Sequence, residues 1–441
     1  MKKLLVIISS LMLISPICFA MTYDEKIADA MNRNDWFALD SIHNAAPKDS
    51  VMPFLEVFSR CLIGNRLNRP DVSVPAFDEL FKSHTANLGL DNLLSSTVMF
   101  ATDLSRIGYN KEASEMMQAI FASTEEYLDS TWTEALSQGI SRYGSLSAYK
   151  PYDVIFSETQ GQIPFSIVPV GEGKYGSVLM HLEASGINGH KADITFDTGA
   201  GVNMICDSLA TAYDLIPVGG DFSVSGVGTR KGRFAIAKEL KLGNITVKDV
   251  PFVIADFETG NAEADRFVGS FNVVVGSELM LQLKDLTIDF AAREITVPAE
   301  APVRSGVFPN MCFGDGMGLN VRGKALDTPL LMNIDTGDAS YGSFGEAFFN
   351  ANKEFIVKEA KTETVRRGGF GGVVESLCYR VPEMPISMGG NTINVPDLIV
   401  YTEGVSAVMD FNCNIGLKTL MMFDKVRFNL VDFVLTTYPD L

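Results

Sequence analysis

The chain has 441 residues, of which 46% are hydrophobic and 20% charged, and its formal net charge is −18. This length predicts about two to four domains, with enough apolar residues for packed cores. A chain this acidic is repelled by nucleic acid and by acidic surfaces, so we expect no nucleic-acid partner.

Residues 1–20 have the features of a secretory signal peptide. Lys2 and Lys3 precede an apolar stretch from Leu4 to Ile14, and Ala20 stands at the expected cleavage point. Cleavage there would remove two lysines and change the formal charge from −18 to −20. We therefore predict an exported protein, periplasmic or extracellular.

Membrane attachment is the alternative to free export. Cys18 suggests a lipoprotein anchor, but Ile17 is larger than the residue that normally precedes a lipidated cysteine. Elsewhere the sequence lacks the roughly eighteen continuous apolar residues that cross a bilayer. We expect neither a lipid anchor nor a transmembrane segment.

Residues 21–148 are predicted to be α-helical. Apolar residues recur there at spacings of three and four, as in Ile27 and Met31, Phe54 and Phe58, and Leu94 and Val98. The pattern predicts stacked helical hairpins with a weak likeness to tetratricopeptide repeats. The role of this region is open between docking a substrate or protein partner, a propeptide, and structural support, which we favour. Residues 149–164 are expected to be a linker.

The remainder of the chain contains Asp-Thr-Gly twice, each time behind an apolar, strand-like run. Asp197-Thr198-Gly199 follows residues 192–196, and Asp335-Thr336-Gly337 follows residues 330–334. One such triplet would occur by chance in roughly a tenth of chains this long. Two triplets in the same context indicate a shared role.

The triplets belong to a longer internal repeat. Gly276, in Val-Val-Val-Gly, lies 79 residues after Asp197, and Gly416, in Cys-Asn-Ile-Gly, lies 81 residues after Asp335. Similar strand pairs follow at 283–297 and 423–437, and a hairpin signal precedes each triplet, at 187–190 and at 321–324 with 326–329 as an insertion. We interpret residues 165–300 and 301–441 as two duplicated β lobes.

These features resemble the retropepsin-like and pepsin-like aspartic peptidases. The likeness covers roughly residues 163–440, and the chain looks most like two retropepsin-like lobes fused in one exported, bacterial-type protein. It implies an all-β bilobal domain in which Asp197 and Asp335 are the catalytic residues of an endopeptidase. Since both aspartates are in one chain, we expect a monomer that needs no cofactor and acts on a polypeptide in extended form.

The residue types suit this chemistry without reference to the family. Gly199 and Gly337 permit a tight turn, so that each aspartate can end a strand and point into a cleft. Thr198 and Thr336 can hold the loops rigid through hydrogen bonds. Two facing carboxylates retain one proton between them, which lets one activate water while the other polarises a carbonyl.

Glycine-rich segments between each triplet and its apolar-apolar-Gly run are candidate flaps over the substrate. They contain Gly226 and Gly228 in the first lobe, and Gly369, Phe370 and Gly371 in the second. Such hairpin tips can approach a peptide backbone closely. An ordinary flexible turn is the alternative for each, and the matched positions favour flaps.

Two residues depart from the family pattern. Asp338 follows the second triplet where the first has Ala200, and Asn414 is unusually polar for an apolar-apolar-Gly run. A third carboxylate would raise the pKa of the dyad if it were buried. These departures leave open a second hypothesis, a catalytically inactive peptide-binding protein with the same fold.

Metal and cysteine chemistry are not expected. The four histidines form no metal-binding motif, and the five cysteines after residue 20 lack CxxC spacing.

Overall fold

The computed structural model describes residues 21–170, 176–225, 229–257, 265, 269–369, 372–402 and 413–439. The chain forms two compact units, which divide between Ser147 and Ala148. The predicted order of a helical region followed by a β-rich region is confirmed. The predicted signal peptide, with Ala20, lies outside the described residues.

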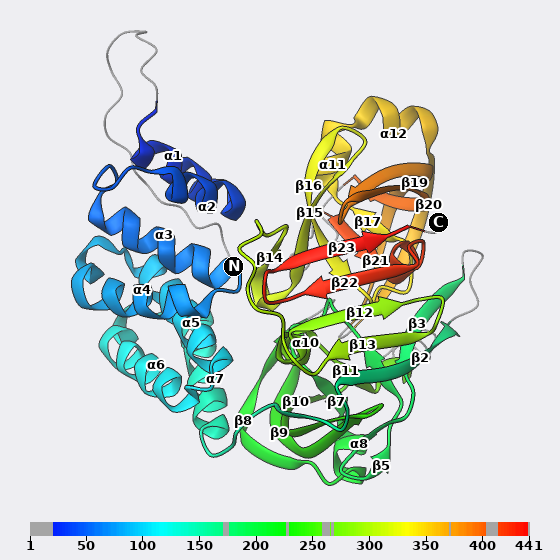
Figure 1. Ribbon diagram of the computed structural model, residues 1–441, viewed down its shortest axis with the longest axis horizontal. Coiled ribbons are helices and arrows are strands. Elements are labelled where there is room, and N and C mark those ends of the chain that lie inside the picture. The colour runs from blue at the N-terminus through cyan, green and yellow to red at the C-terminus, as the bar shows by residue number, and fades with distance from the viewer. Residues whose placement is uncertain are drawn as a thin grey trace. The chain divides into compact units, whose positions relative to one another are not determined.

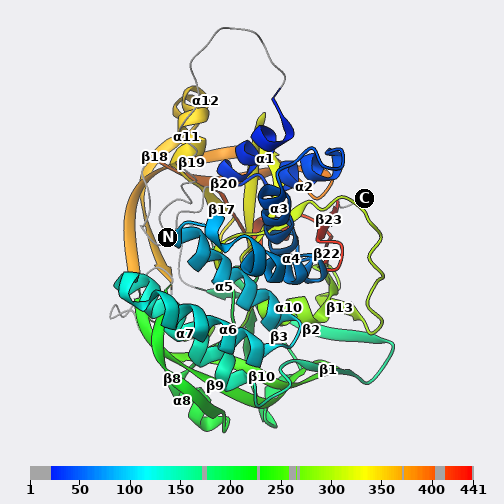
Figure 2. The same cartoon turned by 90° about the vertical axis from the view of Figure 1, so that its left-hand side faces the viewer.

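Seven α-helices occupy the described part of the first unit (Figures 1 and 2). They are α1 (Tyr23–Asn32), α2 (Trp36–Ala45), α3 (Pro53–Arg66), α4 (Pro70–Ser83), α5 (Leu90–Arg106), α6 (Asn110–Thr124) and α7 (Ser130–Leu146). Each helix packs against the next one along the chain. This is the expected stack of helical hairpins, while the tetratricopeptide likeness and the role of the unit stay predictions.

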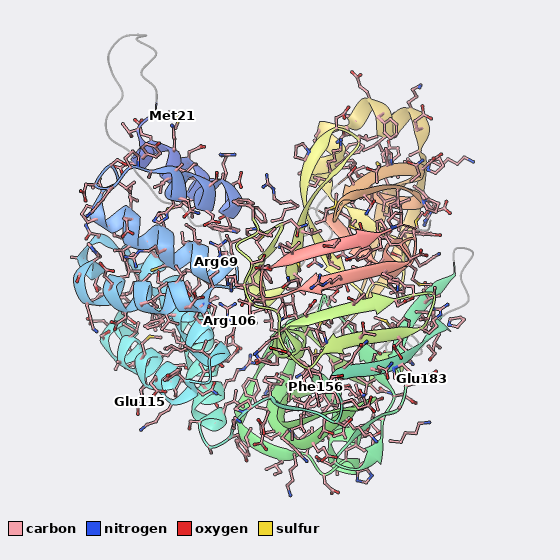
Figure 3. All side chains as sticks on the ribbon, in the orientation of Figure 1. Met21, Arg69, Arg106, Glu115, Phe156 and Glu183 are labelled. Carbon is pink, nitrogen blue, oxygen red and sulfur yellow. The ribbon has the colours of Figure 1, made fainter. Side chains whose placement is uncertain are left out.

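Ionic groups are buried inside the helical unit as well as apolar ones. Arg69, labelled in Figure 3, donates to both carboxylate oxygens of Asp40 at 2.9 and 3.1 Å. The buried Asp103 accepts from Asn65 at 2.9 Å and from Ser73, and also pairs with Arg106. These contacts join α2, α3, α4 and α5, which indicates one cooperative stack rather than separate hairpins.

The second unit contains two β lobes. The first has the strands β1 (Asp153–Phe156), β2 (Gln160–Val170), β3 (Ser177–Leu182), β4 (Ser185–Ile187), β5 (His190–Lys191), β6 (Ile194–Phe196), β7 (Met204–Cys206), β8 (Ile216–Ser225), β9 (Thr229–Leu242), β10 (Ile245–Ala255), β11 (Val273–Val275), β12 (Asp285–Asp289) and β13 (Glu294–Pro298). Its helices include α8 (Asp207–Ala212) and α10 (Ser277–Leu283). Because β1 pairs with β10, the segment expected to be a linker is largely part of this lobe.

The second lobe has the strands β14 (Met311–Phe313), β15 (Leu319–Ala325), β16 (Thr328–Asp335), β17 (Gly342–Phe344), β18 (Lys361–Gly369), β19 (Gly372–Met388), β20 (Asn391–Tyr401), β21 (Cys413–Gly416), β22 (Lys425–Asn429) and β23 (Val434–Tyr438). Its helices are α11 (Glu346–Ala351), α12 (Lys353–Glu359) and α13 (Leu417–Leu420).

The two lobes repeat one strand arrangement. In the first, β6 runs parallel to β11, β11 antiparallel to β7, and β7 parallel to β10. In the second, β16, β21, β17 and β20 pair in the same order and the same directions. The sequence repeat therefore corresponds to a repeat of topology, which places both Asp-Thr-Gly triplets at the end of equivalent strands.

A shared sheet and a shared core join the lobes. Strand β12 pairs antiparallel with β22, and Arg427 donates to both carboxylate oxygens of Asp285 across this junction at 2.9 and 2.7 Å. The largest apolar cluster includes residues of both lobes, such as Phe196, Val275, Ile334 and Ile415. The lobes thus form a continuous support beneath the two triplets.

The two expected hairpin turns differ in outcome. Asn188 and Gly189 have positive φ between β4 and β5, as their sequence predicts for a two-residue turn. The second turn lies at Leu326 and Asp327 rather than at 321–324, since Ala325 pairs with Thr328. Gly323 instead lies within β15, where a Cβ atom would be 2.5 Å from the Ser387 carbonyl oxygen of β19, so its small size serves strand packing.

Candidate active site

The structure brings the two Asp-Thr-Gly triplets together. Asp197 directly follows β6, and Asp335 is the last residue of β16. Each of these strands lies beside the strand of the apolar-apolar-Gly run of its own lobe, with Phe196 opposite Val275 and Ile334 opposite Ile415. Two buried pairs of parallel strands thus direct one carboxylate from each lobe toward the other.

The two threonines cross between the lobes. The Thr198 hydroxyl donates to Ile334 O at 2.6 Å and accepts from Thr336 N at 3.0 Å. The Thr336 hydroxyl donates to Phe196 O at 2.7 Å and accepts from Thr198 N at 3.0 Å. Both side chains are fully buried. These four reciprocal bonds fix the two catalytic-loop candidates against each other, a role that the sequence predicted for the threonines only in general terms.

The glycines of the triplets are required by close packing against the opposite carboxyl group. A Cβ atom on Gly199 would lie 2.5 Å from Asp335 Cγ, and one on Gly337 would lie 2.4 Å from Asp197 Cγ. Their main-chain nitrogens also donate, from Gly199 to Asp197 Oδ1 at 2.8 Å and from Gly337 to Asp335 Oδ1 at 3.0 Å. Any side chain at these positions would push the carboxyl groups apart.

The carboxyl groups of Asp197 and Asp335 come together at the junction of the lobes, each packed against the glycine of the opposite triplet. Burial raises the pKa of Asp197 above its ordinary value. The pKa of Asp335 is raised well above its ordinary value, first by burial and then by the negative charges of Asp197 and Asp338. Both aspartates are half-buried rather than fully enclosed. The pair is therefore suited to hold one proton over a wide pH range.

Asn414 and Asp338 extend the site in the second lobe. The Asn414 amide donates to Asp335 Oδ2 at 3.1 Å and to Asp338 Oδ2 at 2.8 Å, while its oxygen accepts from Asn333 at 2.6 Å. Sequence reasoning noted Asn414 and Asp338 only as departures from a pattern. Their polarity within an otherwise apolar motif was the available signal of a role beside the dyad.

Residues 185–278 match the model of a protein family described as Aspartyl protease. The matched segment includes Asp197, its supporting loop and the Val-Val-Val-Gly run that ends at Gly276. This match supports an aspartic-peptidase fold for the first β lobe. A search of the curated proteins and a search of the solved structures each returned no match.

Both flap candidates lie on β-hairpins. Strands β8 and β9 pair up to Ser225 and Thr229, and β18 and β19 pair up to Gly369 and Gly372. The tips with Gly226 and Gly228, and with Phe370 and Gly371, lie outside the described residues. Hairpins at both places are what flaps require, while their contact with substrate stays a prediction.

Most of the described cysteines are poorly placed to act as nucleophiles. Four of the five described cysteines are buried, and none forms a disulfide with another. Burial raises the pKa of the Cys378 thiol to about 11 and that of Cys413 well above its usual value. Such thiols remain protonated at neutral pH and react poorly.

The described residues contain no group of three or more histidine, cysteine, aspartate or glutamate side chains placed to hold a metal ion. No helix formed by the described residues is both long and apolar enough to cross a membrane.

Proposed function

We propose that the chain is an exported aspartic endopeptidase that hydrolyses peptide bonds with a water molecule activated by Asp197 and Asp335. The packing of each carboxyl group against the glycine of the opposite triplet carries this proposal, because it brings the two carboxyl groups together. Two facing carboxyl groups, both with a raised pKa, provide one base and one acid at the same pH. The aspartyl protease match of the first lobe supports this reaction class.

The pair can complete the reaction without a cofactor. The ionised carboxylate takes a proton from water as the water oxygen adds to the peptide carbonyl carbon. The protonated carboxyl gives its proton to the carbonyl oxygen, which forms a neutral diol. The C–N bond then breaks as the peptide nitrogen takes the proton from the carboxyl group that accepted it from water. At the same time a diol hydroxyl returns a proton to the other carboxylate. Both carboxyl groups end in their starting states.

The substrate of this reaction would be a polypeptide in extended form. The hairpins β8–β9 and β18–β19 both lie between an aspartate loop and its apolar-apolar-Gly strand along the chain. An extended peptide can pair with such hairpins through main-chain hydrogen bonds, because these bonds need no particular side chain. Side-chain pockets would then set the cleavage preference.

A peptide-binding protein without activity is the second candidate, and Asp338 is the observation that favours it. Its negative charge contributes to the raised pKa of Asp335, and Asn414 occupies an oxygen of the same carboxyl group. A dyad held in this way would bind peptide but transfer protons poorly. A peptide-cleavage experiment separates this candidate from the peptidase.

The experiment compares residues 21–441 of the wild type with Asp197→Asn and Asp335→Asn, each incubated with a diverse peptide pool from pH 3 to 8. Mass spectrometry reads the cleavage products. Cleavage by the wild type that is lost in both variants supports the peptidase. Peptide capture without cleavage at any pH, from a folded protein, favours the binding protein.

Export and the monomeric state are separate parts of the proposal. Export rests on the basic and apolar pattern of residues 1–20, and the mature protein should begin at Met21. Mass spectrometry of the secreted protein measures this cleavage point. Light scattering during gel filtration should give the mass of one chain, since both aspartates already belong to it.

A further inference from the structure

The two lobes differ where their catalytic loops are otherwise equivalent. The third residue after the aspartate is Ala200 in the first lobe and Asp338 in the second. The second residue of the apolar-apolar-Gly strand is Val274 in the first lobe and Asn414 in the second. The first lobe thus has two apolar side chains where the second has an acid and an amide. The dyad is therefore asymmetric in its surroundings.

Asp338 is held in place beside Asp335. Its Oδ1 accepts from Ser340 N at 2.9 Å and from the Ser340 hydroxyl at 2.6 Å. Its Oδ2 accepts from Asn414, whose amide also donates to Asp335. Asn414 is itself buried and held by Asn333. Five donated hydrogen bonds thus fix one geometry in which a single amide bridges the two carboxyl groups.

Other charged and titratable groups lie on the strands and helices around the two Asp-Thr-Gly loops. Asp197 faces Asp335 directly, and Arg322 and Lys324 on β15 pair with Leu331 and Pro329, several residues before Asp335 on β16. Lys418 on α13 donates to Gly176 O at 3.1 Å and lies 4.1 Å from the centre of the Tyr341 ring. In the first lobe, His181 on β3 and Glu278 on α10 lie on elements next to the Asp197 loop.

We propose that Asp338, fixed by Ser340 and Asn414, is a positioning residue that places the shared proton of the dyad on Asp335 and leaves Asp197 as the base. The inference rests on the proposed peptidase function and goes beyond it by giving the two aspartates different roles. A fixed carboxylate beside Asp335 favours the protonated form of Asp335. The Asn414 amide partly opposes this effect, because its donation to Asp335 favours the ionised form of Asp335. The same amide also holds Asp338 close to Asp335.

The electrostatic balance agrees with this assignment. The pKa of Asp335 is raised well above its ordinary value, with Asp338 among the causes, whereas Asp338 is not among the main causes of the raised pKa of Asp197. The active dyad carries one proton, and activity at high pH ends when that proton is lost from Asp335. Asp338 should therefore extend activity to higher pH.

The test is the pH profile of kcat for Asp338→Asn, which removes the charge and keeps the shape. Two charges a few ångströms apart near a protein surface interact strongly enough to move a midpoint by about one pH unit. The high-pH limb should therefore move about one unit toward acid. At pH values above the wild-type midpoint, this shift lowers activity about tenfold.

Three variants serve as controls. Asp338→Glu keeps the charge and should keep the wild-type midpoint. Asp338→Ala gives the second lobe the residue that the first lobe has at this position, and it should show the shift if Asp338→Asn fails to fold. Asp432→Asn removes another carboxylate that accepts from Ser305 and Asn429, and it should leave the profile unchanged.

A titration that needs no substrate separates this inference from the function itself. Aspartate carboxyl carbons labelled with ¹³C report the protonation of the dyad, assigned with Asp197→Asn and Asp335→Asn. The expected result is that Asp335 keeps its proton to higher pH than Asp197 and that Asp338→Asn narrows this difference. An unchanged Asp335 titration in Asp338→Asn overturns the inference, even in a protein that cleaves peptides. Absence of cleavage with the expected titration contradicts only the peptidase function.

Discussion

The Thr336 hydroxyl allows the coupling between the two lobes to be measured. It is fully buried, donates to Phe196 O at 2.7 Å and accepts from Thr198 N at 3.0 Å. Thr336→Val keeps the shape of the side chain and leaves these two main-chain groups without their partner. Each buried group left unsatisfied costs about 1–3 kcal/mol. We therefore expect the free energy of unfolding of the β unit to fall by about 2–4 kcal/mol, after partial relaxation.

The assay can follow the two units separately. The chain has two tryptophans, Trp36 and Trp132, and both belong to helices of the first unit. Tryptophan fluorescence in urea therefore reports the helical unit, while hydrogen exchange of peptides from residues 148–441, followed against urea, gives a β signal for the second unit. Separate probes are needed because a chain with two units need not unfold in one step.

Thr336→Val should lower the urea midpoint of the β signal and leave the tryptophan signal unchanged. Thr336→Ser keeps the hydroxyl and loses one methyl group, so it should cost only about 1 kcal/mol. A Thr336→Val midpoint within about 0.5 kcal/mol of the wild type would refute the reasoning, because the four crossed bonds would then contribute little.

Three further predictions concern the same unit. Gly199→Ala should lower kcat by 100-fold or more in a peptide-cleavage assay, because its Cβ would lie 2.5 Å from Asp335 Cγ. The control Gly89→Ala, at a site with open space in the helical unit, should leave kcat unchanged. Asp335→Asn should raise the melting temperature at pH 7 but not at pH 3. The raised pKa of Asp335 in the folded state lowers the stability once the pH exceeds the ordinary aspartate pKa of 3.8, and this cost is absent at lower pH. A higher melting temperature at pH 3 alone would contradict this sign. Arg427→Ala should lower the free energy of unfolding of the β unit by about 1–2 kcal/mol in urea, because the buried Asp285 loses both hydrogen bonds from Arg427. The control Arg33→Ala, at an exposed ion pair, should change the free energy of unfolding by less than about 0.5 kcal/mol.

The sequence allowed the β unit to be predicted because its signals are local and occur twice. An apolar run followed by Asp-Thr-Gly encodes a strand and a tight turn, and the equal spacing to Gly276 and Gly416 indicates a repeat. The parallel pairing of β6 with β11 and of β16 with β21 follows from that repeat. The Asn188-Gly189 turn was predictable for the same reason, since both residues adopt positive φ readily.

Contacts between distant segments could not be predicted in this way. Asn414 and Asp338 lie 76 residues apart, so their bridge to Asp335 depends on the pairing of β16 with β21. The turn at Leu326 was misplaced because Gly323 resembles a turn residue, although a neighbouring strand requires its small size. Strand β1 was assigned to a linker because its partner, β10, lies about ninety residues further along the chain.

The most direct test of the account is whether Asp197 and Asp335 act as a single unit. The measurement is kcat for Asp197→Asn, Asp335→Asn and the double variant, on one peptide that the wild type cleaves. Removing either half of a shared acid–base pair should abolish the reaction, so all three variants should be equally inactive, at least 1000-fold below the wild type by the usual scale of such losses. A single variant that retains substantial activity, or a double variant much slower than both singles, would contradict a shared dyad.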